Sequence, residues 1–415
     1  MLIGQTNHKA FVVYPRAVER EGMETMPLWT DLVEPEFLEP LRRTIAEHVE
    51  PDADAIDRDD VYPEAAIKAL ARHGYNSLTL PAEVGGMGLG FAHCAAVFEE
   101  ASYASAAVGI SLITILQAQT IIRLFAADSL KAAVLPEFSQ GLVTSYALTE
   151  ASHGSDIRHL DTKAVREGDR WVLTGRKSFI TSGSAAEAYV ILAETPVGVS
   201  VFFVRRGMEG VSTEVGPNAA TFGLRNGPHV DLVLDRVAVP LDHMIGEEGK
   251  GVRLAVTTLD YSRTMAAAIS LGIARAAFDG ALDFAARRTA FDRTVLDFQG
   301  IQWYFADMLA EIDAARLLTY AAARALDRHD DIARFGSEAK LLASRVATET
   351  AARAVQICGA YGVMESARFG RYLRDAKAYE IAGGSSEILK NTIAKHLQKL
   401  VAQKLVAGSK TGGMP

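Results

Sequence analysis

Apolar positions recur at three- and four-residue spacing along the first part of the chain. This periodicity covers residues 36–49 and 63–73, and an apolar, Ala-rich stretch follows over residues 91–127. Such spacing places apolar side chains along one face of a helix. We therefore predict an N-terminal α-helical domain over residues 35–145, preceded by an N-terminal arm over residues 1–34.

A glycine-rich segment, residues 85–90, lies within this helical part. A loop of this composition could cradle a phosphate group. However, it lacks the Lys-Ser/Thr ending of a P-loop and does not follow a strand of a βαβ unit. A tight connection between two helices is therefore the favoured interpretation.

From Tyr146 to about Gly246 the pattern changes to short β-branched and aromatic runs, separated by polar turns. These runs predict the strands of a compact β domain over residues 146–248. The clearest of them are residues 170–173, 189–193, 199–204 and 230–234.

Helical periodicity returns after Gly249 and predicts a C-terminal helical domain over residues 249–406, followed by a flexible tail over residues 407–415. The sequence therefore predicts a mainly α protein with a central β domain. The predicted C-terminal helices cover residues 264–287, 301–327, 337–359 and 386–401.

Composition narrows the class of protein. The net charge of −8 is spread along 415 residues, which argues against nucleic acid or an anionic membrane as a partner. The two cysteines, Cys94 and Cys358, lie far apart in predicted helices, so we expect buried free thiols in a reducing compartment. We find no signal peptide and no uncharged apolar run long enough for a bilayer. A soluble, cytoplasmic metabolic protein is expected.

The segment with the most candidate functional residues is residues 146–156, where the helical pattern changes to the β pattern. This segment is rich in small and hydroxyl residues, which let N–H and O–H groups approach the polar edge of a flat ring. Taken alone, it could be an elaborate capped turn, because Thr, Ser and Asp favour such positions.

The segment resembles the signature of the acyl-CoA dehydrogenase family, Tyr-x-x-Thr-Glu-x-x-x-Gly-Ser-Asp, followed by an aromatic-Ile-Thr strand. Further motifs of that family follow in the same order through the chain. They are Phe179-Ile180-Thr181, Arg225, Asp235-Arg236-Val237-Ala238-Val239-Pro240, Gly249-Lys250-Gly251, Arg288-Thr289-Ala290-Phe291, Gln299, Gln356-Ile357-Cys358-Gly359, Arg374-Asp375-Ala376-Lys377 and Gly384-Ser385-Ser386-Glu387-Ile388.

The resemblance implies an FAD cofactor. In the family pattern Phe179 packs on the flavin, Thr181 hydrogen-bonds near its reactive nitrogen, and Arg288 reaches the pyrophosphate of a neighbouring subunit. From the residues alone, Arg288 could also be a solvated charge at a helix end. The complete set that the resemblance assigns to the cofactor is Tyr146, Leu148, Thr149, Gly154, Ser155, Phe179, Thr181, Arg288, Phe291, Gln299, Gln356, Gly359, Ser385 and Glu387.

The same resemblance implies the architecture and the partners. We expect an N-terminal α domain, a middle β-barrel-like domain and a C-terminal four-helix bundle. We also expect a homodimer or homotetramer, because the cofactor is shared across a subunit interface in this family. The substrate would be a thioester on CoA or on a carrier protein, and an electron-transferring flavoprotein would accept the electrons. No metal site is predicted.

The carboxylate base of the family is missing. Most relatives place a Glu where this chain has Gly383, and the isovaleryl and long-chain branches place one where it has Ser262, before Arg263. Glycine has no side chain and a serine hydroxyl is too weakly basic for this work. By resemblance Ser155, Arg263 and Gly383 bind substrate, and the Gly383 N–H polarises the thioester carbonyl. Arg263 also counts among the catalytic positions.

Other ionisable residues are candidates for a replacement base. Asp260 precedes Ser262 by two positions, so the two do not share a helix face, and a structural ion pair is the favoured interpretation. Glu99 and Glu100 lie on a helix that approaches the acyl pocket in relatives, and either could also face solvent. His153, in the flavin loop, could titrate near neutrality. Glu380 matches a non-catalytic position.

Three functions therefore stay open. The first is oxidation of an acyl thioester to its α,β-unsaturated form with an atypical or relocated base. The second is other chemistry on the same scaffold, such as desulfination, where loss of a leaving group makes an α-base unnecessary. The third is a non-catalytic interaction scaffold, which would be expected to show decayed cofactor motifs.

Overall fold

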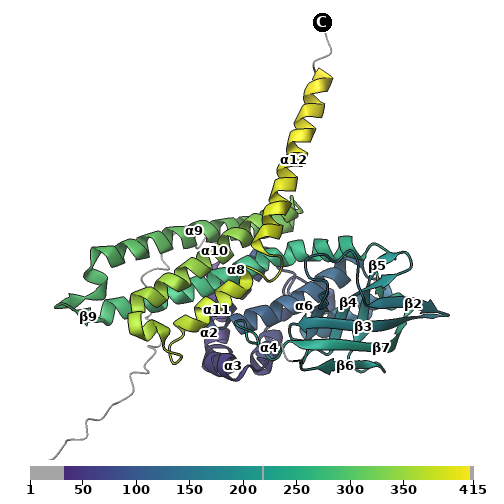
Figure 1. Ribbon diagram of the computed structural model, residues 1–415, viewed down its shortest axis with the longest axis horizontal. Coiled ribbons are helices and arrows are strands. Elements are labelled where there is room, and N and C mark those ends of the chain that lie inside the picture. Colours follow the sequence, from purple (N-terminus) through teal and green to yellow (C-terminus); the bar gives the residue numbers. More distant parts are fainter. Residues whose placement is uncertain (1–31, 217–218, 412–415) are drawn as a thin grey trace, which may run out of the picture.

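The computed structural model describes residues 32–216 and 219–411, with side chains up to Gln403. The predicted arm over residues 1–34 lies almost entirely outside this part. The described chain forms a helical part, a sheet at one end of the molecule, and a second set of long helices that runs past both (Figure 1). This arrangement confirms the predicted mainly α fold with a central β domain.

The N-terminal part consists of helices with the two most apolar ones, α5 and α6, innermost. Almost every side chain of α6 is buried, as expected of a helix that is apolar on all sides. The helices are α2 (Pro35–His48), α3 (Ala53–Asp59), α4 (Glu64–Arg72), α5 (Phe91–Ala104), α6 (Ala106–Phe125) and α7 (Asp128–Ser139).

The middle part is one eight-stranded, largely antiparallel sheet in the order β6-β7-β3-β2-β4-β5-β8, with β1 pairing in parallel with β4. β4 and β5 are buried along almost their whole length. The strands are β1 (Thr144–Ala147), β2 (Lys163–Glu167), β3 (Arg170–Ile180), β4 (Ala188–Thr195), β5 (Gly198–Arg205), β6 (Val211–Glu214), β7 (Val230–Pro240) and β8 (Met244–Ile245).

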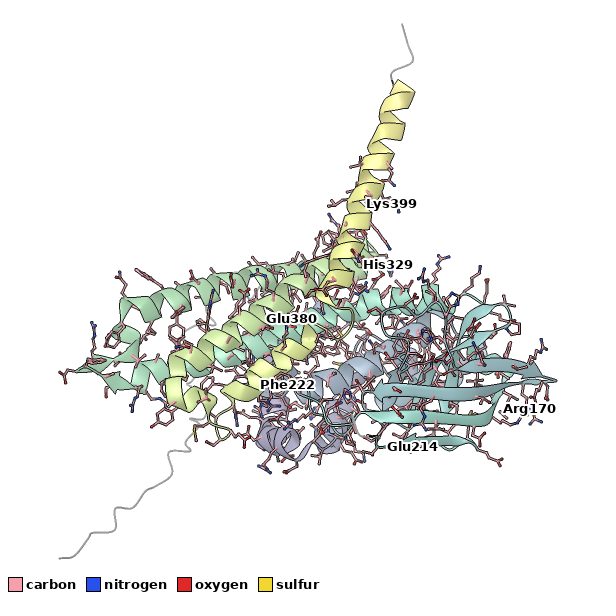
Figure 2. All side chains as sticks on the ribbon, in the orientation of Figure 1. Arg170, Glu214, Phe222, His329, Glu380 and Lys399 are labelled. Atoms are coloured by element: carbon pink, nitrogen blue, oxygen red, sulfur yellow. The ribbon has the colours of Figure 1, made fainter. Side chains whose placement is uncertain are left out.

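The C-terminal part is built around α8, a helix of 37 residues. A short hairpin, β9–β10, joins α8 to α9, and α12 projects away from the body (Figures 1 and 2). The elements are α8 (Gly251–Arg287), β9 (Thr289–Ala290), β10 (Arg293–Thr294), α9 (Gln299–Arg328), α10 (Ile332–Cys358), α11 (Phe369–Tyr379) and α12 (Ser386–Thr411).

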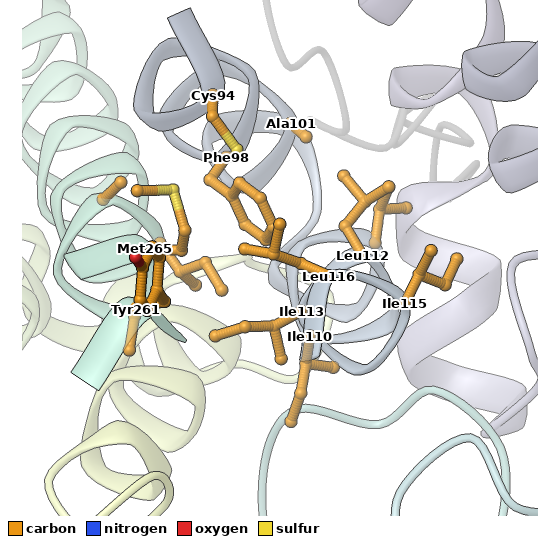
Figure 3. Packing of buried hydrophobic residues seen from close by; sticks show 14 of the residues in the cluster. Cys94, Phe98, Ala101, Ile110, Leu112, Ile113, Ile115, Leu116, Tyr261 and Met265 are labelled. Carbon is orange, nitrogen blue, oxygen red and sulfur yellow. The ribbon is translucent and has the colours of Figure 1, made fainter. Parts of the chain in front are cut away.

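The core is continuous between the two helical parts. Phe98 of α5, Ile113 and Leu116 of α6, and Tyr261 and Met265 of α8 point toward one another (Figure 3). Because these side chains interdigitate, the segment of α8 just after Tyr261 is held in a fixed place relative to the N-terminal helices.

Three helices differ in extent from the sequence prediction. The stretch predicted as one helix over residues 91–127 is two, because Ser105 adopts an extended conformation (φ −153°, ψ 111°) and begins α6 as its N-cap. α8 begins at Gly251, before the predicted Thr264. α12 continues to Thr411, past Val406, where the sequence suggested a frayed tail.

The sequence expectation that no apolar run could span a bilayer was wrong for two helices. By length and composition alone, α6 and α8 are long and apolar enough to do so. Both are core helices here, since 83% and 78% of their most apolar windows are buried inside the protein.

A buried ion network locks α5 to α8 and α9. The Glu99 carboxylate accepts hydrogen bonds from Arg275 (2.9 Å), Arg316 (3.0 Å) and the Tyr320 hydroxyl (3.0 Å). Glu100 accepts from the same Arg275 at 3.0 Å. Burial alone would raise the pKa of Glu99, but Arg316 and Arg275 outweigh it and hold this pKa below its ordinary value.

Replacing Glu99 with glutamine should destabilise the fold by about 3–5 kcal/mol, because it removes the buried charge that two largely buried guanidinium groups share. The measurement is the free energy of unfolding in urea at neutral pH. Asp59→Asn, which breaks the exposed pair with Arg58, is the control and should leave the midpoint nearly unchanged. Equal midpoints for the two variants would contradict a structural role for the network.

Candidate functional site

The segment after β1 is fastened to the end of β3. The Ser178 N–H donates to the Thr149 carbonyl at 2.9 Å. The buried Lys177 Nζ donates to the Leu148 carbonyl at 3.2 Å and to Glu150 Oε1 at 2.8 Å. Burial raises the pKa of Glu150, but its hydrogen bonds with Lys177 and Thr162 outweigh this and lower it overall. The ion pair therefore fixes the loop to the strand.

Glu150, His153 and Asp161 offer ligand atoms that lie within 4.8 Å of one another. However, both oxygens of Glu150 already accept hydrogen bonds, one from Lys177 and the Thr162 N–H and the other from the Asp161 N–H. This cluster is therefore explained as the fastening of the loop. His153, considered above as a base, faces Asp161 at 3.6 Å.

Two predicted cofactor residues stand at the end of β3 in unusual surroundings. Phe179 is 50% exposed although its neighbours in the strand are buried, and its φ of 59° lies in the left-handed region. That conformation costs an L-residue about 1–2 kcal/mol, which is typical of positions retained for function. Thr181, two residues on, is half-buried and accepts from Ser145 Oγ through its carbonyl at 2.6 Å.

These residues fit a flavin. The exposed Phe179 ring offers a flat apolar face, and Thr149 and Thr181 offer hydroxyl groups on backbone that is hydrogen-bonded in place. Ser155 and Gly154 are exposed on the same loop, while Tyr146 and Leu148 are half-buried at its start. When bound, FAD supplies the two-electron acceptor, and these residues would hold its ring.

The second group of predicted cofactor residues lies at the other end of the molecule. Arg288 and Gln299 flank the β9–β10 hairpin and Phe291 lies in its turn, on the opposite side of the molecule from the sheet (Figure 1). Gln356 and Gly359 lie at the end of α10. All five are exposed.

The turn of the hairpin has a strained backbone, and it exposes the side chain of Phe291. Phe291 and Asp292 form its two-residue turn, and both have positive φ (51° and 62°), the geometry that favours Asn-Gly. The Phe291 side chain is 88% exposed. It borders a groove of about 780 Å³ that is lined by Phe291, Val295, Phe298, Gly300, Ile301, Trp303, Tyr304 and Asp307.

Ser262 and Gly383, the two positions at which the family resemblance leads one to expect a base, are linked through Arg263. Ser262 of α8 is buried and its hydroxyl accepts a hydrogen bond from Gln117 Nε2 of α6 at 3.2 Å. Arg263, the next residue, donates from Nε to the Gly383 carbonyl at 3.4 Å. A Cβ atom added at Gly383 (φ 71°) would meet no other group within 4 Å. Open space therefore adjoins Gly383.

Two cationic side chains, Arg263 and Lys340, bind the backbone carbonyls of Gly383 and Gly384. Asp260 binds Arg263 at 2.6 Å on the same helix, as the sequence suggested. Burial raises the pKa of Asp260 to about 6 against the opposing effect of Arg263. The buried Lys340 Nζ donates to the Gly384 carbonyl at 2.7 Å. Burial, followed by Arg263, lowers the pKa of Lys340 to about 8.

The other carboxylates that are candidates for the base also form ion pairs. Glu99 and Glu100 are buried rather than solvent-facing, in the network with Arg275. Glu380 pairs with Lys377 at 2.7 Å. Ser385 and Glu387 lie at the foot of α12, next to the Gly383–Gly384 pair in sequence.

Sequence reasoning missed three side chains that shape the site: Gln117, Lys177 and Lys340. A polar residue within a very apolar helix is the signal that could have identified Gln117. Lys177 and Lys340 gave no such signal, since the acceptors that they bind come from distant segments.

Comparison with known proteins places these features in a family. Residues 34–141 match the acyl-CoA dehydrogenase N-terminal domain, residues 145–237 the middle domain and residues 249–398 the C-terminal domain. The probable acyl-CoA dehydrogenase fadE25 of Mycobacterium leprae is 34% identical over 388 residues, which cover 91% of this chain and 99% of that protein.

Solved structures of similar fold support the same family. The butyryl-CoA dehydrogenase of Megasphaera elsdenii is 30% identical, with a TM-score of 0.85 over 88% of this chain and 97% of that one. A structure described as an electron transferring flavoprotein of Acidaminococcus fermentans is 31% identical, with a TM-score of 0.84 over 88% and 98%. The chain belongs to the acyl-CoA dehydrogenase family and is an FAD-dependent oxidoreductase that acts on CH–CH groups.

Proposed function

We propose that this enzyme oxidises the α–β bond of an acyl thioester, with an atypical arrangement in place of the family's base. The observation that carries the proposal is the half-buried Gly383 N–H, which donates no hydrogen bond within the described part of the chain. It lies beside Arg263, where a thioester carbonyl would accept it. Such a donor stabilises the negative charge that develops on that oxygen.

The thioester is carried by CoA or by a carrier protein. The M. leprae relative and the M. elsdenii structure are both described as dehydrogenases of acyl-CoA, which supports CoA. The similarity to the A. fermentans structure supports an electron-transferring flavoprotein as the electron acceptor. Two free, buried cysteines support a reducing, cytoplasmic location.

The active unit is a homodimer or a pair of dimers. Phe179 belongs to β3 of the sheet, whereas Arg288 and Phe291 belong to the segment around β9, which lies on the opposite side of the molecule from the sheet (Figure 1). One FAD that needs both groups must therefore take them from two copies. The exposed Phe291 ring and its groove support contact with a second copy.

Replacing Arg288 with alanine should weaken FAD binding about 10- to 150-fold, because it removes a charge-assisted contact worth about 1.5–3 kcal/mol. FAD affinity can be measured by titrating the apoprotein and following flavin fluorescence. The matched control is Arg287→Ala at the neighbouring residue, which pairs with Asp283 on its own helix and should bind FAD as the wild type does. Unchanged affinity in Arg288→Ala would remove it from the cofactor site.

Mixing two defective subunits in equal amounts should restore about one quarter of the FAD sites, because about half of the dimers are mixed and each of these has one intact site. Phe179→Asp damages the ring contact and Arg288→Ala damages the partner's contact, so a mixed dimer has one intact site and one doubly damaged site. Bound flavin per dimer can be measured after unfolding and reassembly of the mixture. Each variant reassembled alone is the control. No recovery in the mixture would show that one chain supplies both groups.

Replacing Gly383 with glutamate should accelerate flavin reduction by butyryl-CoA about 10²–10⁴-fold, the usual contribution of a general base. The open space beside Gly383 can accept the side chain. Gly383→Gln is the control, because it imposes the same size and backbone strain without a carboxylate. The measurement is anaerobic bleaching of the flavin. Equal rates for the two variants would show that a carboxylate here is not the missing element.

A further inference from the structure

Thr181, which the proposed site places against the flavin, lies in a strained part of the backbone. Phe179 precedes it by two residues and Ser182 follows it directly, and both have a φ in the left-handed region, at 59° and 58°. Neither residue is a glycine, so this conformation is unfavourable for the segment on its own. Surrounding groups must therefore hold residues 179–182 in place.

Asn226 is a side chain that holds Ser182. Its Nδ2 donates to Ser182 Oγ at 3.1 Å and to Ser111 Oγ of α6 at 3.0 Å. Thr114, one turn further along α6, donates to the same Ser182 oxygen at 3.4 Å. All four side chains are buried, and those of Asn226 and Ser111 are completely so. Because water is excluded, these hydrogen bonds restrain Ser182 more strongly than they would at the surface.

The backbone on both sides of Asn226 is itself fixed by the two helical parts. This residue lies in the loop that joins β6 to β7. On one side the Leu224 N–H donates to Asp375 Oδ1 of α11 at 2.6 Å. On the other side the Gly227 N–H donates to Asp60 Oδ1, just after α3, at 3.2 Å. The Asn226 carboxamide is therefore a donor in a fixed position, and it ties the end of β3 to the helices.

We infer, given that Phe179 and Thr181 contact the flavin as proposed, that Asn226 is a positioning residue for FAD. Through Ser182 it holds residues 179–182 in the backbone conformation that presents the Phe179 ring and Thr181. The segment is then arranged before the cofactor arrives, so FAD binding does not have to supply the free energy for arranging it. Asn226 acts through Ser182 and needs no contact with FAD.

Asn76 is a buried asparagine that lies outside this network and serves as the matched control. It is 6% exposed, and its Nδ2 donates to the Ile67 carbonyl in the N-terminal part at 3.3 Å. Like Asn226, it has a carboxamide oxygen without a hydrogen-bond partner among the described residues. Replacing either asparagine with alanine removes a buried amide, so both variants should lose stability. They should differ in their effect on FAD.

Asn226→Ala should weaken FAD binding by the full-length chain about 5- to 30-fold, the factor that corresponds to left-handed backbone that nothing holds. Asn76→Ala should bind FAD as the wild type does. The loss should appear in the association rate constant, because only the segment without flavin relaxes, and the dissociation rate constant should stay unchanged. Rapid mixing of the apoprotein with FAD, followed by flavin fluorescence, measures both constants.

Two variants at Ser182 test whether the effect acts through its backbone. Ser182→Ala removes the hydroxyl that Asn226 and Thr114 bind but keeps the strain, so it should weaken FAD binding as Asn226→Ala does. Ser182→Gly removes the same hydroxyl, yet glycine adopts a positive φ readily, so its affinity should stay close to that of the wild type. In the Ser182→Gly background, Asn226→Ala should no longer weaken binding.

Equal losses of affinity in Ser182→Ala and Ser182→Gly would overturn the inference, and this pair decides the matter even if Asn226→Ala does not fold. Equal losses in Asn226→Ala and Asn76→Ala would also overturn it, as would a loss confined to the dissociation rate constant. Phe179→Asp separates this failure from that of the proposed site. If Phe179→Asp loses affinity while the Asn226 and Ser182 variants do not, the site stands and only the role of Asn226 fails. If none of them loses affinity, the placement of the flavin against residues 179–182 fails.

Discussion

The rest of the structure depends on one constraint, which is that other helices must bury the apolar surface of α8. This 37-residue helix is buried on most of its surface, and exposing such an apolar helix to water would be strongly unfavourable. α5 and α6 cover one side, while α9 and α10 cover another. Because Ser262 and Arg263 lie within this covered segment, the packing that buries α8 also fixes these two residues of the candidate site.

The periodic patterns predicted most elements well, since long amphipathic helices and β-branched strands leave local signals. The break at Ser105 escaped prediction because a serine within an Ala-rich run is compatible with one continuous helix. The early start of α8 at Gly251 was also missed. Its first turns carry a mixture of polar and apolar residues, and tertiary packing decides their conformation.

The sequence predicted only those residues of the candidate site that belong to short, continuous sequence motifs. Phe179, Thr181 and the loop at Thr149 were found in this way, and the structure brings them together at one strand end. Gln117 and Lys340 escaped because the groups that they bind lie 145 and 44 residues away along the chain. Long-range pairs of this kind leave no pattern in a single sequence.

The separation of the two cofactor-binding ends has a thermodynamic consequence. If one FAD bridges Phe179 of one copy and Arg288 of another, ligand occupancy and subunit association obey a single linked equilibrium. Dilution that separates the copies then also releases flavin, and free flavin in turn favours assembly. The yellow colour of a preparation would report its protein concentration as well as its cofactor supply.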